Sequence, residues 1–196
     1  MEADANGRRD SGARVPNVYL IGPMGSGKTT IGQRVAEILG LEFLDCDQEL
    51  ESQTGASVSL IFDVEGETGF REREMKMLEK LAQREGVLIA TGGGVVSMPR
   101  NRELLRRGGI VVYLRTSVAQ QMKRLGRDRS RPLLQTANRR ERLERLAAER
   151  DPLYQDLADI EFPSQNRNVD VSARKLADRI LDHLAQSASA ASHGHA

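Results

Sequence analysis

The sequence predicts an α/β protein with a parallel sheet that helices cover on both faces. Short apolar segments with the composition of strands alternate with longer segments in which apolar residues recur at helical spacing. Two of the apolar segments, 87–90 and 110–114, are continuous, as is typical of strands buried on both faces of a parallel sheet. Strands that alternate with helices favour right-handed βαβ units, because parallel neighbours need a crossover connection.

Length and composition favour one domain with a well-developed core. The chain has 196 residues, of which 39% are hydrophobic and 29% charged, and its net charge is +1. No apolar run approaches the roughly 20 residues that a membrane-spanning helix needs, so we expect no membrane partner. The one cysteine, Cys46, excludes an internal disulfide and favours a reducing compartment, which we expect to be the cytoplasm. The three histidines lie near the C-terminal end, which argues against a histidine metal site in the core.

The first predicted strand, 18–21, leads into Gly22-Pro-Met-Gly-Ser-Gly-Lys28-Thr29. This is the pattern Gly, four residues, Gly-Lys-Thr that forms a phosphate-binding loop, or P-loop. Apolar residues at helical spacing follow it, and Gly40 ends the predicted helix. Strand, glycine loop and helix together direct backbone N–H groups and a helix N-terminus at a polyphosphate. We therefore expect a nucleoside triphosphate to bind at Gly25, Ser26, Gly27, Lys28, Thr29 and Thr30, with Lys28 at the outer phosphates.

The second predicted strand, 41–45, ends in two aspartates on the side of the sheet where ligands bind. Asp45 and Asp47 flank a single residue, and in an open α/β sheet ligands bind beyond the carboxyl ends of the strands. One carboxylate would face a Mg²⁺ ion that the Thr29 hydroxyl also binds, and the other would face an acceptor hydroxyl as base or orienting group. The alternative is a helix cap, the usual role of aspartate before a helical segment, and spacing alone does not decide.

An acidic insertion, about 46–80, follows the second strand. Ser57 is expected to cap a helix over 58–63, and a charged helix follows over 67–83, with Phe70, Met77, Leu78 and Leu81 inward.

Strand 87–90 then opens into Gly92-Gly93-Gly94. Three glycines at the end of a buried strand let the backbone approach a ligand closely, whereas the alternative is a flexible turn.

The second half of the chain repeats the alternation of strand and helix. We expect a helix from Pro99 to 108, a strand over 110–114, a helix capped by Ser117 that ends at Leu125, a helix over 139–150, a last strand over 159–162 with further strand residues at 169–171, and a helix capped by Ser172 that includes Leu184. Residues 16–185 would form one domain, whereas 1–15 and 186–196 lack core-forming residues and are expected to be a disordered arm and tail.

Two interruptions of the core favour a kinase over a nucleotide-only switch. A kinase must hold a second substrate in line with the γ-phosphate and exclude water, and the insertions at about 46–80 and 126–137 would serve as acceptor site and lid.

Arg71 and Arg150 are candidates for binding an anionic acceptor, because guanidinium pairs with carboxylate through two parallel hydrogen bonds. Either arginine could instead be a surface charge. In the lid, several arginines compete for the contact with the transferring phosphate.

Basic residues outnumber acidic ones between Arg100 and Arg150, which raises nucleic acid as a partner. A solvated helix face explains most of these arginines, and an aromatic content of 4% supplies no stacking platform. We therefore expect small-molecule partners and a monomer that binds no nucleic acid.

The motifs taken together resemble those of the shikimate kinase family. Seven motifs occur in the order and spacing of that family: Gly22–Thr29, Asp45-Cys-Asp47, Ile61-Phe-Asp63, Gly69-Phe-Arg71, Gly92–Gly94, Arg131-Pro-Leu-Leu134 and Pro152-Leu-Tyr154. The resemblance implies a three-layer α/β/α fold with a five-stranded parallel sheet, as in nucleoside monophosphate kinases, with a substrate-binding insertion and a mobile lid. It also implies that the γ-phosphate of ATP passes to the 3-hydroxyl of shikimate, on the way to chorismate and the aromatic amino acids.

The resemblance assigns roles to individual residues. Lys28, Asp47 and Arg131 would be catalytic, with Asp47 on the acceptor hydroxyls as candidate base or orienting group and Asp45 near Mg²⁺. The other positions carried over are the acceptor-binding Arg71, Gly92, Gly93, Gly94 and Arg150, the phosphate-contacting Arg131, the adenine-contacting Arg124 and Arg167, and an apolar wall of Phe62, Phe70 and Pro132.

Two alternatives to a shikimate kinase are weighed on these residues. A gluconate-type kinase on the same scaffold also has a hydroxylated carboxylate as acceptor, and the Phe70-Arg71 and Arg131–Leu134 motifs argue against it. A catalytically silent P-loop regulator would be expected to lack Lys28, Asp47 or the lid arginine, and all three are present.

Overall fold

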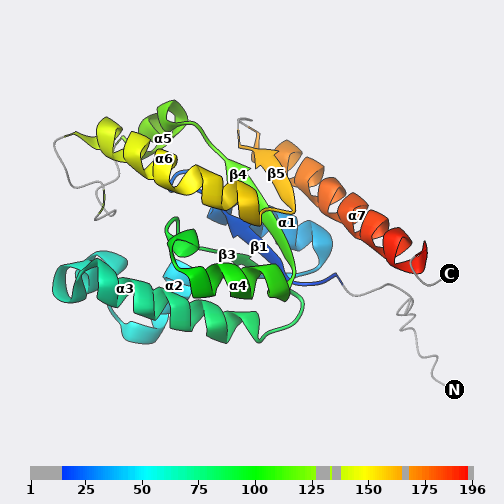
Figure 1. Ribbon diagram of the computed structural model, residues 1–196, viewed down its shortest axis with the longest axis horizontal. Helices are drawn as coiled ribbons and strands as arrows, with labels where there is room; N and C mark the ends of the chain where they lie inside the picture. Colours follow the sequence, from blue (N-terminus) through cyan, green and yellow to red (C-terminus); the bar gives the residue numbers. More distant parts are fainter. Residues whose placement is uncertain (1–14, 127–132, 134–137, 165–167, 194–196) are drawn as a thin grey trace, which may run out of the picture.

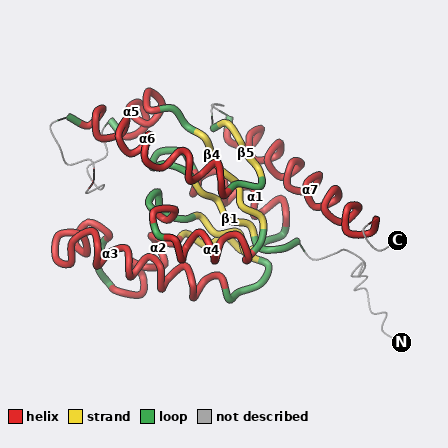
Figure 2. The backbone as a smooth tube through the Cα atoms, in the orientation of Figure 1, coloured by secondary structure: helices red, strands yellow, loops and turns green. Residues whose placement is uncertain are grey.

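The structure is a computed structural model that describes residues 15–126, 133, 138–164 and 168–193. Five strands form one sheet in the order β2-β3-β1-β4-β5, and every pairing is parallel. Figure 2 shows the strands in yellow, surrounded by the helices in red. The strands are β1 (Val18–Ile21), β2 (Glu42–Asp45), β3 (Val87–Ala90), β4 (Ile110–Arg115) and β5 (Ile160–Pro163). The predicted α/β class and five-stranded parallel sheet are confirmed.

Helices cover both faces of this sheet (Figure 1). On one face α1 (Lys28–Leu39) packs against α7 (Val169–His193). The other face carries α2 (Cys46–Thr54), α3 (Val58–Ala82), the 3₁₀ turn η1 (Val95–Ser97), α4 (Pro99–Gly108) and α6 (Arg139–Leu157), and α5 (Val118–Leu125) packs against α6. The chain therefore has the three layers α/β/α.

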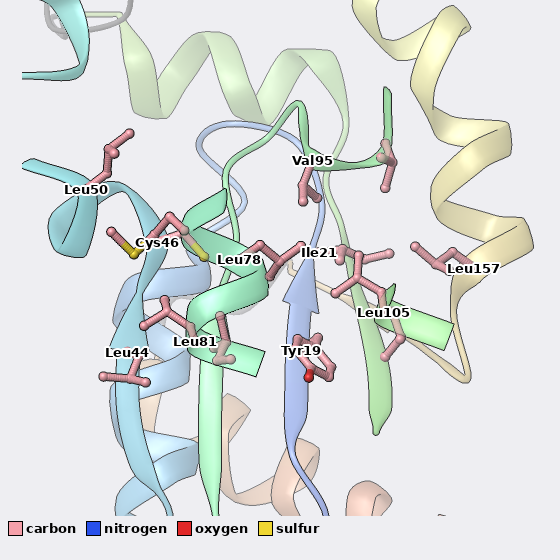
Figure 3. Close-up of a cluster of buried hydrophobic side chains, with 14 of the residues drawn as sticks. Tyr19, Ile21, Leu44, Cys46, Leu50, Leu78, Leu81, Val95, Leu105 and Leu157 are labelled. Carbon is pink, nitrogen blue, oxygen red and sulfur yellow. The ribbon is translucent and has the colours of Figure 1, made fainter. Parts of the chain in front are cut away.

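The alternation of side chains along each strand builds two cores, one on each face of the sheet. In β1, Tyr19 and Ile21 point to the α3–α4 side and are fully buried there (Figure 3), while Val18 and Leu20 point to α1 and α7. Since both faces are covered, all four residues of β1 are buried, as its continuous apolar sequence predicts.

Most predicted helix boundaries are confirmed by their caps. Gly40 ends α1 in the left-handed conformation, with φ of 67°, and Ser117 begins α5 with a reciprocal capping box to Gln120. Ser57 accepts a hydrogen bond from the backbone N–H of Leu60 at the start of α3. Within α3 the helix breaks at Gly66, where φ is 70° and ψ is −178°, so the two predicted helices are joined end to end.

Three predictions about the C-terminal part are wrong. Residues 169–171 are the first turn of α7 and not strand, because Asn168 caps the helix through the N–H of Val171. Helix α6 does not end at Arg150 but continues to Leu157. Helix α7 also runs on to His193, so 186–193 is not a disordered tail. Alanine has the highest helix propensity, which favours helix over this alanine-rich segment.

The register of the sheet determines where ligands can approach. Asp45 pairs with Ala90 and Leu20 pairs with Val112, so the carboxyl ends of β2, β3, β1 and β4 lie at one edge. The P-loop, the Asp45-Cys46-Asp47 motif and the triple glycine all leave the sheet at this edge. No helix in the described part of the chain is both long and apolar enough to cross a membrane.

Candidate active site

The P-loop connects β1 to α1 and collects positive charge at its centre. The Lys28 ammonium donates hydrogen bonds to the carbonyls of Gly22 at 2.7 Å and Pro23 at 3.0 Å, so it lies over the loop. Gly27 caps α1 in the left-handed conformation, with φ of 90° and no side chain over the helix N-terminus. The helix end and the ammonium therefore converge, as a polyphosphate site requires.

A cavity of about 380 Å³ lies along the P-loop. It is lined by Met24, Gly25, Gly27, Lys28, Thr29, Thr30, Asp45, Asp47, Gln48, Glu51, Val58, Thr91 and Leu125. Five of the six predicted nucleotide-binding residues of the loop are in this lining, whereas Ser26 is fully buried beneath the loop. The same cavity is also lined by two carboxylates, Asp45 and Asp47, from the segment where β2 passes into α2.

Asp45 caps α2, which is the alternative role considered from the sequence, and it also contacts the P-loop. Its Oδ1 accepts the backbone N–H groups of Asp47 at 3.0 Å and Gln48 at 3.3 Å, which caps α2. Its Oδ2 accepts a hydrogen bond of 2.7 Å from the Thr29 hydroxyl. The cap thus fixes the carboxylate so that its other oxygen faces the P-loop.

The oxygens of Thr29 and Asp45 fit a Mg²⁺ ion. Magnesium prefers hard oxygen ligands and is bound through one or two protein groups, with phosphate oxygens and water completing the octahedron. Among the described residues no group of three or more acidic, histidine or cysteine side chains forms a metal cage. An ion here would therefore depend on the nucleotide phosphates for several of its ligands.

Asp47 lies in the first turn of α2, between the P-loop cavity and the triple glycine. It lines the cavity, and a Cβ added to Gly92 would be 3.3 Å from its Oδ1. A side chain at position 92 would also overlap Glu74, at 2.1 Å from its Oε1. Glycine at 92 thus allows two carboxylates to lie against the backbone at the end of β3.

The Arg71 guanidinium is buried against Gly94. Its Nη1 forms an ion pair of 2.7 Å with Glu74, and its Cζ lies 5.2 Å from the centre of the Phe70 ring. A Cβ on Gly94 would be 2.2 Å from Arg71 Nη2, so a side chain at this position would displace the guanidinium from its place. Phe62 packs on Phe70 with ring centres 4.4 Å apart, which places two of the three predicted apolar wall residues beside this arginine.

Glu74, the buried partner of Arg71, is in an unusual electrostatic position. Its side chain is 2% exposed, and its Oε1 has no hydrogen-bond partner among the described residues. Burial raises the pKa of the Glu74 carboxyl above its ordinary value, although the Arg71 charge acts in the opposite direction.

Arg150 reaches the triple glycine from α6, whereas Arg71 reaches it from α3. Its Nη1 donates to the carbonyl of Gly93 at 3.2 Å, and the Tyr154 hydroxyl donates to the same carbonyl. Burial lowers the pKa of the Arg150 guanidinium. Arg150 Nη2 and Arg71 Nη2 both face Oε1 of Glu67, at 4.0 Å and 3.1 Å. The two arginines therefore converge, as the acceptor hypothesis requires.

The triple glycine also contacts the P-loop. A Cβ on Gly93 would be 3.1 Å from the backbone N of Met24, inside the loop. The two arginines beside Gly93 and Gly94 are thereby held next to the phosphate-binding loop. An anion held by the arginines and a polyphosphate on the loop would be neighbours, which is the arrangement that transfer between them needs.

Comparison with known proteins decides the family. The shikimate kinase family model matches residues 24–185. A shikimate kinase of Vibrio parahaemolyticus is 50% identical over 168 residues, covering 86% of this chain and 95% of that protein. The chain belongs to the shikimate kinase family. It is thus an ATP-dependent kinase by family, and the resemblance inferred from the motifs is confirmed.

Solved structures agree with this family assignment. Shikimate kinase from Acinetobacter baumannii in complex with shikimate aligns with a TM-score of 0.81 at 47% identity, covering 88% of this chain and 94% of that one. A gluconokinase from Sinorhizobium meliloti aligns over 93% of this chain and 99% of that one, with a TM-score of 0.56 at 16% identity, which is a likeness of fold alone. The similarity thus favours the shikimate kinase family over the sugar-acid kinase considered from the sequence.

The predicted residues of this shikimate kinase family member fall into two groups. Arg131, Pro132 and Arg167 lie outside the described residues. The P-loop residues, Asp45, Asp47 and the triple glycine lie at the edge formed by the carboxyl ends of the strands, and Arg71 and Arg150 contact these glycines. Arg124, expected to contact adenine, donates hydrogen bonds to the carbonyls of Gly25 at 2.9 Å and Ser164 at 2.7 Å.

Ser164 was missed by the sequence reasoning. It is buried directly after β5, and its hydroxyl donates to the P-loop carbonyl of Ser26. Together with Arg124 it ties the end of β5 to the P-loop. The only available signal was its position at the carboxyl end of the last strand, next to the predicted ligand edge.

Proposed function

We propose that this protein transfers the γ-phosphate of ATP to the 3-hydroxyl of shikimate, giving shikimate 3-phosphate and ADP for chorismate and aromatic amino acid synthesis. The observation that carries the proposal is the convergence of Arg71 and Arg150 beside Gly93, whose backbone contacts the P-loop. Two guanidinium groups in a buried site suit a carboxylate, and the neighbouring loop suits a triphosphate.

Each part of the site has a role in this transfer. The backbone of Gly25–Thr30 and the Lys28 ammonium hold the phosphates, and Arg131 and Arg124 contact the nucleotide, with Arg167 at the adenine. Arg71 and Arg150 bind the acceptor carboxylate beside Gly92, Gly93 and Gly94. Asp47 orients the acceptor hydroxyl, whose oxygen forms the new bond to phosphorus while the bond to the β-phosphate oxygen breaks.

Asp47 is also the candidate that accepts the hydroxyl proton. It lines the P-loop cavity and lies against Gly92, so it is placed between donor and acceptor. A loose transition state for phosphoryl transfer needs little help from a base, so orientation can be the larger part of its contribution.

Thr29 and Asp45 would hold Mg²⁺ through the oxygens described above. When bound, the ion neutralises charge that develops on the phosphate oxygens. We also propose that the protein acts in the cytoplasm, where ATP is available, and that it acts as a monomer.

A coupled assay of ADP release tests the proposal. With ATP and Mg²⁺, shikimate should support turnover in the range of about 1–100 s⁻¹ that is typical of kinases. Gluconate should support at least about 100-fold less, because the contacts made by an acceptor in this site depend on the positions of its hydroxyls. Equal turnover with the two acceptors, or turnover with gluconate alone, would refute the assignment of shikimate.

A further inference from the structure

Glu67 lies between the two arginines that are proposed to bind the acceptor carboxylate. Its Oε1 is 3.1 Å from Arg71 Nη2 and 4.0 Å from Arg150 Nη2. Both arginine side chains are 9% exposed, whereas the Glu67 side chain is 47% exposed. One carboxylate oxygen thus reaches from the solvent side to the outer nitrogen of both guanidinium groups.

The other terminal nitrogen of each arginine is held by the protein. Arg71 Nη1 pairs with Glu74 at 2.7 Å, and Arg150 Nη1 donates to the Gly93 carbonyl at 3.2 Å. The two Nη2 groups are therefore the ones that face the acceptor side. An acceptor carboxylate that binds to both Arg71 and Arg150 has to use the same Nη2 nitrogens that Glu67 faces in this structure.

Charge balance makes simultaneous binding unfavourable. Two guanidinium groups face two carboxylates, those of Glu67 and Glu74. A third carboxylate, brought by the acceptor, would leave one negative charge in excess beside buried groups, where charges are poorly screened. The balance is restored when Glu67, the more exposed of the two, moves out.

The backbone before Glu67 permits such a movement. Gly66 has φ of 70° and ψ of −178°, a conformation essentially restricted to glycine, and it breaks α3 immediately before Glu67. Glu67 consequently lies at the start of the helical segment that carries Arg71. Its side chain can leave the arginines without unwinding the turns that hold Arg71 and Glu74.

We propose that Glu67 is an internal competitor for the acceptor carboxylate, pairing with both arginines in the free protein and giving way when the acceptor binds. This inference rests on the proposed function, in which these arginines bind the carboxylate. Its consequence is selectivity. A simple anion must displace Glu67 with its charge alone, whereas an acceptor with hydroxyl groups also gains contacts at Asp47 and the triple glycine.

Calorimetric titration of the full chain with shikimate tests the inference. Glu67→Gln keeps the shape of the side chain and removes its charge, and Glu72→Gln is the control, because it removes an exposed carboxylate from the same helix. The dissociation constant for shikimate should fall about three- to tenfold in Glu67→Gln, as expected from the loss of a partly exposed competing ion pair. It should not change in Glu72→Gln.

Thermal unfolding and ADP binding complete the test. The Glu67→Gln change removes a charged partner of Arg71 and Arg150. The melting temperature of this variant should therefore fall by up to about 4 °C, while its affinity for shikimate rises. A merely structural role would lower both together. Unchanged or weaker shikimate binding by folded Glu67→Gln, with normal ADP binding, would overturn the competitor role alone. Wild-type protein that fails to bind shikimate would overturn the proposed function and this inference with it.

Discussion

The Tyr154 hydroxyl donates a hydrogen bond to the carbonyl of Gly93, which also accepts one from Arg150. Tyr154 is 1% exposed and stacks on Tyr113 with ring centres 5.0 Å apart. A buried helix residue thereby fixes the orientation of the peptide group after Gly93. One turn of α6 thus carries both Arg150, which we propose binds the acceptor, and the tyrosine that holds the glycine backbone in place.

We predict that Tyr154→Phe raises the KM for shikimate several-fold and leaves the KM for ATP unchanged. The carbonyl retains Arg150 as a partner, so the free energy of unfolding should fall by only about 1 kcal/mol. Tyr113→Phe is the matched control, because Tyr113 lies in the same stack and its hydroxyl donates to Asp151 at 3.1 Å instead. Steady-state kinetics of both variants provide the check, and an equal change in the two would contradict a positioning role for Tyr154.

Arg71→Lys is expected to raise the KM for shikimate about 10- to 100-fold, since a charge-assisted contact of roughly 1.5–3 kcal/mol is lost. Lysine keeps the positive charge beside Glu74 but lacks the guanidinium fork. Arg73→Lys, on the exposed side of the same helix where Arg73 pairs with Glu65, is the control. A larger effect of Arg71→Lys on ATP than on shikimate would mean that the acceptor site has been misassigned.

Asp47→Asn should lower kcat about 10²- to 10⁴-fold, the range seen when a positioned acid–base group is removed. ATP affinity, measured by equilibrium binding, should remain nearly the same, because Lys28 and the loop backbone are untouched. Glu49→Gln removes the other acidic side chain from the first turn of α2, so it controls for the effect on the helix dipole. Parallel losses of turnover and ATP binding in Asp47→Asn would contradict its assigned role.

The raised pKa of Glu74 predicts a pH dependence of stability. The folded state holds this proton more tightly than the unfolded state, whose glutamate pKa is near 4.5. The stabilisation by the protonated form is therefore complete below about pH 4.5 and is lost as pH rises through the raised pKa, at up to about 1.4 kcal/mol per pH unit.

Glu74→Gln should lack this contribution, which denaturant unfolding at a series of pH values would reveal. The difference in unfolding free energy between wild type and Glu74→Gln should shift against the wild type as pH rises above 4.5. Glu72→Gln provides the comparison for an exposed glutamate. A difference that does not vary with pH would contradict the raised pKa.

Local patterns predicted much of the site because its parts are local. The P-loop, Asp45-Cys46-Asp47 and Gly92–Gly94 each follow a strand, and parallel strands bring their carboxyl ends to one edge whatever their order. The contacts between these parts were beyond sequence reasoning. Gly93 meets Arg150 57 residues later, and Ser164 meets Ser26 138 residues earlier, and neither separation carries a periodic signal.

The errors of secondary structure have a common physical origin. The 169–171 segment is β-branched and alternating, so its intrinsic preference is for strand, and the Asn168 cap overrides that preference. The alanine-rich end of α7 lacks large apolar residues at helical spacing, so its pattern predicts a tail, although the helix propensity of alanine is high. Glu67 was not singled out either, since an exposed acid next to other acids carries no pattern of its own.

Calorimetric titration with shikimate and with its methyl ester, in the presence of ADP and Mg²⁺, tests the central claim most directly. The ester keeps the ring and hydroxyls but has no carboxylate charge for Arg71 and Arg150 to bind. One-to-one binding of shikimate, with the ester at least about 100-fold weaker, is the predicted result. Equal affinity for the two compounds would contradict the account, because the arginine pair would then not be what holds the acceptor.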